Sequence, residues 1–172
     1  FPIVTIDKKY ECLPISYVIS DNFTGGYIAA NHLYEKGHKN LGFVSGQNID
    51  TMMSVRERFF GYCKSVNEHG NDINLNQIKL GVKETLGYIH QLNNEEIDVI
   101  KNVITDLLEH DVSGVILEND YAAINLERIC QDLGVKIPEE FAVVGFDNVE
   151  LAHNANVPLT TIEQNFYRIG ET

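Results

Sequence analysis

The chain has 172 residues, 44% of them hydrophobic, and a formal net charge of −12 at pH 7. This composition supports one ordinary globular domain, or two small lobes, around a buried core. The acidic balance, without a Lys/Arg-rich stripe or a helix-turn-helix pattern, argues against DNA binding by this segment alone.

The first half of the chain alternates predicted strands and helices. After two short strands, apolar residues from Tyr27 to Leu33 recur at close to helical spacing, and Gly37 ends that helix in the usual left-handed position. The elements expected here are strands at residues 1–7, 17–20 and 41–44 and helices at residues 23–36 and 54–68.

The second half repeats the alternation. Asn94 begins a long helix with Glu95 and Glu96 in its first turn, which favours the helix dipole. Residues 83–93 fit either a helical turn or a loop over a cleft. The elements expected here are strands at residues 78–82, 112–117, 141–145 and 159–162 and helices at residues 94–110 and 120–133.

This alternation of strands and helices predicts the α/β class. Strands joined by helices form right-handed crossovers, which place the strands parallel and the helices on both faces of the sheet. We therefore expect residues 20–156 to form a doubly wound parallel sheet.

The segment V-V-G-F-D-N at residues 143–148 carries the clearest functional signal. A buried strand ends there, and Phe146, Asp147 and Asn148 follow at its carboxyl end. Open α/β sheets bind ligands outside the carboxyl ends of their strands. A proline and the β-branched strand L-T-T-I come next in the chain.

Four segments, in order along the chain, resemble the lactose-repressor/galactose-repressor (LacI/GalR) family of bacterial transcription regulators. The match is carried by D-N-F-T-G-G-Y-I-A-A-N-H-L-Y-E-K-G-H, S-V-R-E-R-F-F-G-Y, G-V-I-L-E-N-D-Y-A-A and L-G-V-K-I-P-E-E-F-A-V-V-G-F-D-N. Residues 52–53 and the stretch after residue 83 depart from the family pattern.

The resemblance implies the fold and organisation of a type I periplasmic-binding-protein-like domain, in which two α/β lobes close on a sugar or sugar phosphate. It assigns residues 1–19 to the end of an N-terminal lobe, residues 20–156 to the C-terminal lobe and residues 157–172 to a return segment toward the N-terminal lobe. Because the chain opens inside a predicted strand and ends where a helix begins, we expect it to be part of a longer protein.

The resemblance also implies partners beyond the effector. Family members bind operator DNA through a separate headpiece, which this sequence lacks, and they act as homodimers because palindromic operators match two-fold symmetry. The helices at residues 94–110 and 24–36 are alternative dimer interfaces. No membrane partner is expected.

Effector contacts carry over to Asp7, Arg56, Asn119 and Asp147. Their chemistry suits a polyol, since carboxylates accept hydroxyl protons and an arginine donates to two oxygens in fixed geometry. Phe146 is expected to pack on the apolar face of a sugar.

Each of these residues has a structural alternative. Asp7 could cap a turn. Within the Asn119–Asp120 pair, one residue must cap the following helix, and we assign the cap to Asp120 and the ligand to Asn119. We assign Arg58 to a structural salt bridge rather than to the ligand.

Other functions have weaker support. A secreted sugar-binding protein of a transporter shares the fold, but its class does not account for the G-F-D and S-x-R motifs. No nucleophile elbow, Walker loop or dinucleotide fingerprint is present, so we expect no enzyme. No cofactor or metal site is predicted, because the histidines are scattered and Cys12, Cys63 and Cys130 lack zinc spacing. We interpret these cysteines as buried thiols of a cytoplasmic protein.

Overall fold

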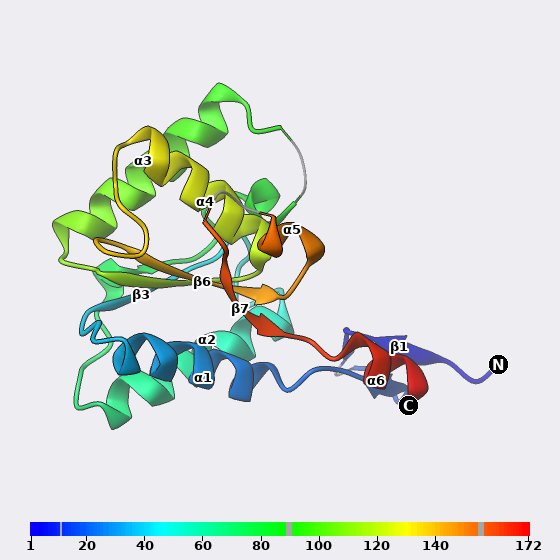
Figure 1. Cartoon of the computed structure of the whole chain (residues 1–172). Coiled ribbons are helices and arrows are strands. Elements are labelled where there is room, and N and C mark those ends of the chain that lie inside the picture. The colour runs from blue at the N-terminus through cyan, green and yellow to red at the C-terminus, as the bar shows by residue number, and fades with distance from the viewer. Residues whose placement is uncertain (11, 89–90, 155–156) are drawn as a thin grey trace.

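The computed structural model describes residues 1–10, 12–88, 91–154 and 157–172, and it contains two parallel sheets (Figure 1). The main sheet has five strands in the order β4-β3-β5-β6-β7, and the small sheet pairs β1 with β2. Every strand pair is parallel. The predicted α/β class and the doubly wound parallel sheet are confirmed.

The strands are short and follow the predicted positions closely. They are β1 (Val4–Ile6), β2 (Ser16–Val18), β3 (Leu41–Val44), β4 (Ile78–Lys79), β5 (Gly114–Leu117), β6 (Ala142–Asp147) and β7 (Thr160–Glu163). β3 and β5 are buried along their whole length, as expected of strands covered on both faces.

Helices cover both faces of the main sheet, with α1 and α2 on one side and α3 and α4 on the other (Figure 1). The helices are α1 (Asn22–Glu35), α2 (Met53–Glu68), α3 (Asn94–Glu109), α4 (Asp120–Asp132), α5 (Glu150–His153) and α6 (Phe166–Glu171). Each face has its own apolar cluster, one centred on Phe43 and Tyr62 and the other on Leu117 and Leu126.

Helices α1 and α2 pack with their backbones nearly in contact. A Cβ built on Gly26 of α1 would lie 2.0 Å from the carbonyl oxygen of Arg58, and one built on Gly61 of α2 would lie 2.0 Å from the carbonyl oxygen of Phe23. Only glycine fits at such a distance. This close packing fixes α2, and with it Arg58, against the sheet.

The stretch after β4, for which the sequence fits either a helical turn or a loop, contains a single turn of 3-10 helix at Glu84–Gly87. This agrees with one of the two predicted alternatives, although residues 89 and 90 lie outside the described part of the chain. The amide of Asn119 donates to the carbonyl oxygen of Gly87 at 3.0 Å, so the turn is tied to the carboxyl end of β5.

The small sheet and α6 lie together beside the main lobe, with both termini there (Figure 1). We expected all of residues 157–172 to return toward another lobe. The structure differs, because β7 pairs with β6 and forms the edge of the main sheet. Only the residues after β7 lie beside β1.

Candidate functional site

A cavity of about 350 Å³ opens at the carboxyl ends of β3, β5 and β6. Its polar walls come from segments far apart in the sequence. The charged and amide side chains that line it are Asp7, Lys8, Gln47, Arg58, Glu118, Asn119, Asp147 and Gln164. The position agrees with the rule that open parallel sheets bind ligands at this edge.

Arg58 on α2 is the buried cation of the cavity, with 6% of its surface exposed. Its Nε donates to Asn22 Oδ1 at 2.9 Å, and Nη1 donates to the carbonyl oxygen of Glu118. Its Nη2 lies 3.8 Å from Asp147 Oδ1. Burial lowers the pKa of Arg58, whereas the surrounding carboxylates raise it, with the largest contribution from Asp147. The guanidinium is therefore held in place by groups from α1, β5 and β6.

Asp147 ends β6 with a left-handed backbone, φ +111°, and Asn148 follows at φ +56°. Burial raises the pKa of Asp147 to about 6, because the loss of hydration outweighs the nearby Arg58 charge and the hydrogen bond from Gln164. Gln164 Nε2 donates to Asp147 Oδ1 at 2.5 Å. The carboxylate is thus anchored on one oxygen, and its residue lines the cavity.

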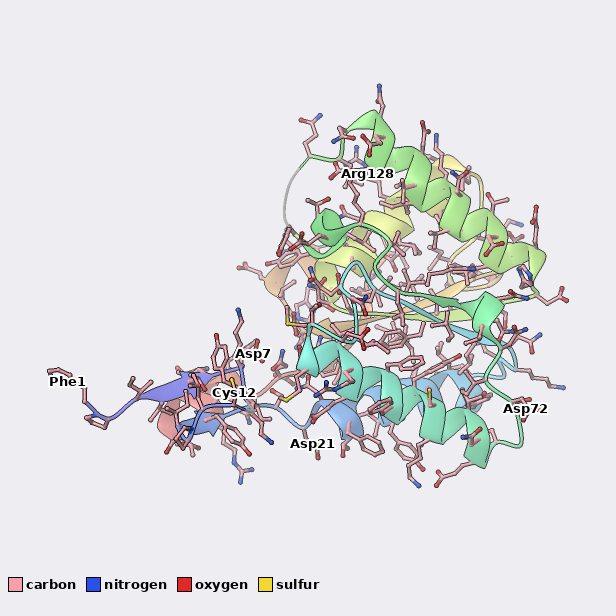
Figure 2. The ribbon with its side chains drawn as sticks, turned by 180° about the vertical axis from the view of Figure 1, so that it is seen from behind. Phe1, Asp7, Cys12, Asp21, Asp72 and Arg128 are labelled. Carbon is pink, nitrogen blue, oxygen red and sulfur yellow. The ribbon has the colours of Figure 1, made fainter. Side chains whose placement is uncertain are left out.

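Asp7 reaches the same cavity from the small sheet. It lies at the end of that sheet nearest the main lobe, whereas Phe1 lies at the far end (Figure 2). Its backbone is left-handed, φ +61°, and its N–H donates to the carbonyl oxygen of Val18 at 2.9 Å. Asp7 therefore ends β1, as expected, and its backbone makes the turn that brings it beside the cavity.

The structure reverses the predicted roles of Asn119 and Asp120. Asn119 caps α4, since its Oδ1 accepts from the N–H of Ala122 at 2.9 Å. Asp120 is fully buried and accepts from the N–H of Val149 at 2.8 Å and from the hydroxyl of Thr161 at 2.5 Å. Asn119 still lines the cavity, but both ends of its amide already have protein partners.

Arg56 is not among the residues that line the cavity, and Arg58 takes the position expected of it. A signal for this was present in the sequence. The family pattern R-x-x-G fits Arg58 and Gly61, and Arg58 lies three residues after Val55 on the buried face of α2. The predicted structural salt bridge of Arg58 does exist, but its partner is Asp147 inside the cavity.

Phe146 does not face this cavity. Its side chain is buried, and a Cβ built on Gly25 of α1 would lie 2.5 Å from its ring. The centre of the ring lies 3.6 Å from the Arg58 guanidinium, a cation–π arrangement. Phe146 lines a different hollow with Ile162. Its place is therefore beneath Arg58 rather than against a ligand in the cavity.

Glu118, which no sequence pattern singled out, is a buried carboxylate of this site. It is 3% exposed, and its Oε2 accepts from Ser45 Oγ at 2.6 Å and from the N–H of Gln47 at 3.2 Å. Its Oε1 is buried without a hydrogen-bond partner in the part of the chain that the structure describes. The only feature of the sequence that could have indicated this role is the position of Glu118 directly before Asn119, at the end of β5.

Within the described ranges, no helix is long and apolar enough to cross a membrane, and no three His, Cys, Asp or Glu side chains gather as a metal site. Of the cysteines predicted to be buried, Cys130 is buried, Cys63 is half-buried and Cys12 is exposed. The expectation of buried thiols is wrong for Cys12, which lies on the small sheet side of the molecule (Figure 2).

A doubly wound lobe with a polar cavity at its carboxyl edge is typical of one lobe of a ligand-binding domain. Residues 30–172 match the periplasmic binding protein-like domain, and the chain belongs to this family. It is 32% identical over 172 residues to the HTH-type transcriptional repressor PurR of Photobacterium profundum, covering 99% of this chain and 48% of that protein. The chain thus spans about half the length of that relative.

Solved structures agree with this assignment. The transcription regulator CcpA of Lactococcus lactis has a TM-score of 0.80 at 22% identity, covering 98% of this chain and 57% of that one. A LacI family transcriptional regulator from Enterococcus faecium with bound ribose has a TM-score of 0.75 at 26% identity, covering 99% of this chain and 58% of that one. The resemblance to the LacI/GalR family is confirmed.

Proposed function

We propose that the chain is the effector-sensing portion of a DNA-binding transcriptional regulator that responds to a sugar or sugar phosphate. The observation that carries the proposal is the convergence of Asp7, Arg58 and Asp147 on one cavity at the carboxyl edge of the sheet. Carboxylates and a fixed guanidinium suit a polyhydroxyl ligand. The ribose bound to a regulator of the same fold supports this class of ligand.

The organisation of the whole protein is part of the proposal. Residues 1–19 belong to an N-terminal lobe, residues 20–156 to the C-terminal lobe, and the segment after β7 to the return into the N-terminal lobe. A headpiece outside this chain binds operator DNA, and the protein acts in the cytoplasm as a homodimer without enzymatic activity. The support is that the relative described above is a transcriptional repressor of the HTH type.

A calorimetric titration of the full-length protein against sugars and sugar phosphates tests the effector site. Asp147→Ala removes charge-assisted hydrogen bonds worth about 1.5–3 kcal/mol each. Affinity for the sugar that binds wild type should therefore fall about tenfold to more than a hundredfold for each bond. Arg56→Ala is the matched control, because Arg56 does not line the cavity, and it should bind the same sugar as wild type does.

Unchanged binding by a folded Asp147→Ala would refute the site. The regulatory part is tested separately, by the retention of genomic DNA fragments on the full-length protein with and without that sugar. A secreted transporter protein of this fold would retain no specific fragment, so such a result would favour the alternative.

A further inference from the structure

A second cavity, of about 330 Å³, lies at the opposite end of β6 from the candidate effector site. Ala142 and Val143, at the start of β6, line it, whereas Asp147 at the other end lines the first cavity. Five residue rises of about 3.3 Å separate Ala142 from Asp147, so the Cα atoms of these two lining residues are roughly 16 Å apart. Among the residues that the structure describes, none lines both cavities.

The walls of this second cavity are largely apolar. The apolar side chains that line it are Leu33, Ile137, Pro138, Ala142, Val143, Val144, Val157 and Pro158. The pairing of β6 with β7 begins at Val144 and Thr160, and both residues line the cavity, so it lies at the start of that pairing. Such a wall suits the hydrocarbon part of a small molecule.

Glu127 of α4 places a carboxyl group in this apolar wall. It is 4% exposed, and no residue within the described ranges donates a hydrogen bond to its side chain. A buried carboxylate without a partner is costly, so it gains most from a ligand that supplies a positive charge and a hydrogen-bond donor together. Burial raises the pKa of Glu127 to about 7.

The basic side chains of the cavity come from the other face of the sheet. His32 and Lys36 lie at the end of α1, and His38 follows them. Lys36 is exposed and therefore at the rim. Burial lowers the pKa of His38, and the nearby His32 lowers it further, which favours the neutral imidazole. The buried charge of the cavity is therefore the one that Glu127 supplies.

We propose that this cavity is a second binding site, for a small amphipathic amine whose hydrocarbon part packs on the β6 edge and whose ammonium group pairs with Glu127. The site is separate from the effector cavity, and its occupancy does not depend on the proposed sugar specificity.

Ligand-observed saturation-transfer NMR on the full-length protein at pH 8 tests the proposal, with n-butylamine as probe and n-butanol and butyrate as matched compounds. At this pH the amine is protonated and Glu127 is mostly ionised. Butylamine should bind, while butanol and butyrate should bind at least tenfold more weakly, because neither offers an ammonium donor.

Three variants locate the bound amine. Glu127→Gln should weaken butylamine binding about tenfold or more. Asp132→Asn, which changes an exposed carboxylate on the same helix, and Asp147→Asn, which changes the effector cavity, should both leave it unaltered. If Glu127→Gln does not fold, Glu127→Met replaces it, because an apolar side chain needs no partner.

The proposal is overturned if butylamine does not bind, if butanol or butyrate binds as well, or if Glu127→Gln binds as tightly as wild type. Loss of binding in Asp147→Asn would also overturn it, since the amine would then occupy the effector cavity.

Discussion

Replacing Glu127 by glutamine should change how the stability of the protein depends on pH. Glu127 is 4% exposed, and burial raises its pKa from 4.5 to about 7. Between these values the folded chain holds a proton that the unfolded chain has lost. Stability contributed by this group is therefore fully present below about pH 4.5 and is lost as the pH rises through 7.

The size of the effect follows from the pKa of Glu127. A pKa difference of one corresponds to about 1.4 kcal/mol, so a rise from 4.5 to about 7 corresponds to roughly 3 kcal/mol. Because the side chain is almost completely buried, screening by solvent reduces this little. Glu127→Gln cannot ionise, so the free energy of unfolding of the variant should gain about 3 kcal/mol relative to wild type between pH 4 and pH 8.

Urea unfolding of both proteins at pH 4, 6 and 8 measures this difference. The glutamine amide also lacks a partner in the apolar wall, but that cost is the same at every pH and cancels from the pH dependence. Asp147, whose pKa burial also raises, is present in both proteins and cancels too. Asp132→Asn on the same helix is the exposed control and should follow wild type. A difference between Glu127→Gln and wild type that is constant across pH would refute the reasoning.

Three further substitutions, two of them paired with a control variant, test the packing of the effector site by urea unfolding. Arg58→Ala should lower the free energy of unfolding by about 3 kcal/mol, because it removes a buried guanidinium and leaves the half-buried Asp147 carboxylate without its cation. It should cost more than Arg56→Ala, whose side chain does not line the cavity. Gly26→Ala should cost at least about 1–3 kcal/mol, because its methyl group would meet the α2 backbone at 2.0 Å. Asn119→Ala should cost about 1 kcal/mol through the lost α4 cap, and Asn119→Asp should keep that cap. Equal losses for Arg58→Ala and Arg56→Ala, or for the two Asn119 variants, would contradict these assignments.

The elements of the main sheet could be predicted because their signals are local. Apolar residues at helical spacing place α1 to α4 to within two residues at each end, and continuous apolar runs place β3, β5 and β6. The strand predicted at residues 78–82 is shorter, however. Gly81 adopts a left-handed backbone, φ +65°, which an extended strand does not allow, so β4 ends at Lys79.

The assignment of caps at the end of β5 was wrong for a different reason. Asparagine and aspartate are equally good helix caps, so the sequence offers no local preference between Asn119 and Asp120. The choice is made by Val149 and Thr161, which hold the Asp120 carboxylate through two hydrogen bonds from 29 and 41 residues away. Once Asp120 is engaged there, Asn119 is the residue left to cap α4.

Tertiary contacts also explain why the sequence assigned Arg58 only a structural salt bridge and why Glu118 was missed. Asn22, Glu118 and Asp147 are 36, 60 and 89 residues from Arg58 in the chain, and they meet it only after α1, β5 and β6 have assembled. In the sequence, each of these three residues can equally be interpreted as a turn residue or as the end of a helix. No short sequence pattern therefore indicates that they gather around Arg58. A buried guanidinium requires several acceptors at once, and the carboxyl edge of a parallel sheet brings such groups together from separate strands. The order of strands and helices is enough to predict where the site lies. The tertiary contacts are needed to show that Arg58 is the cation around which its carboxylates gather.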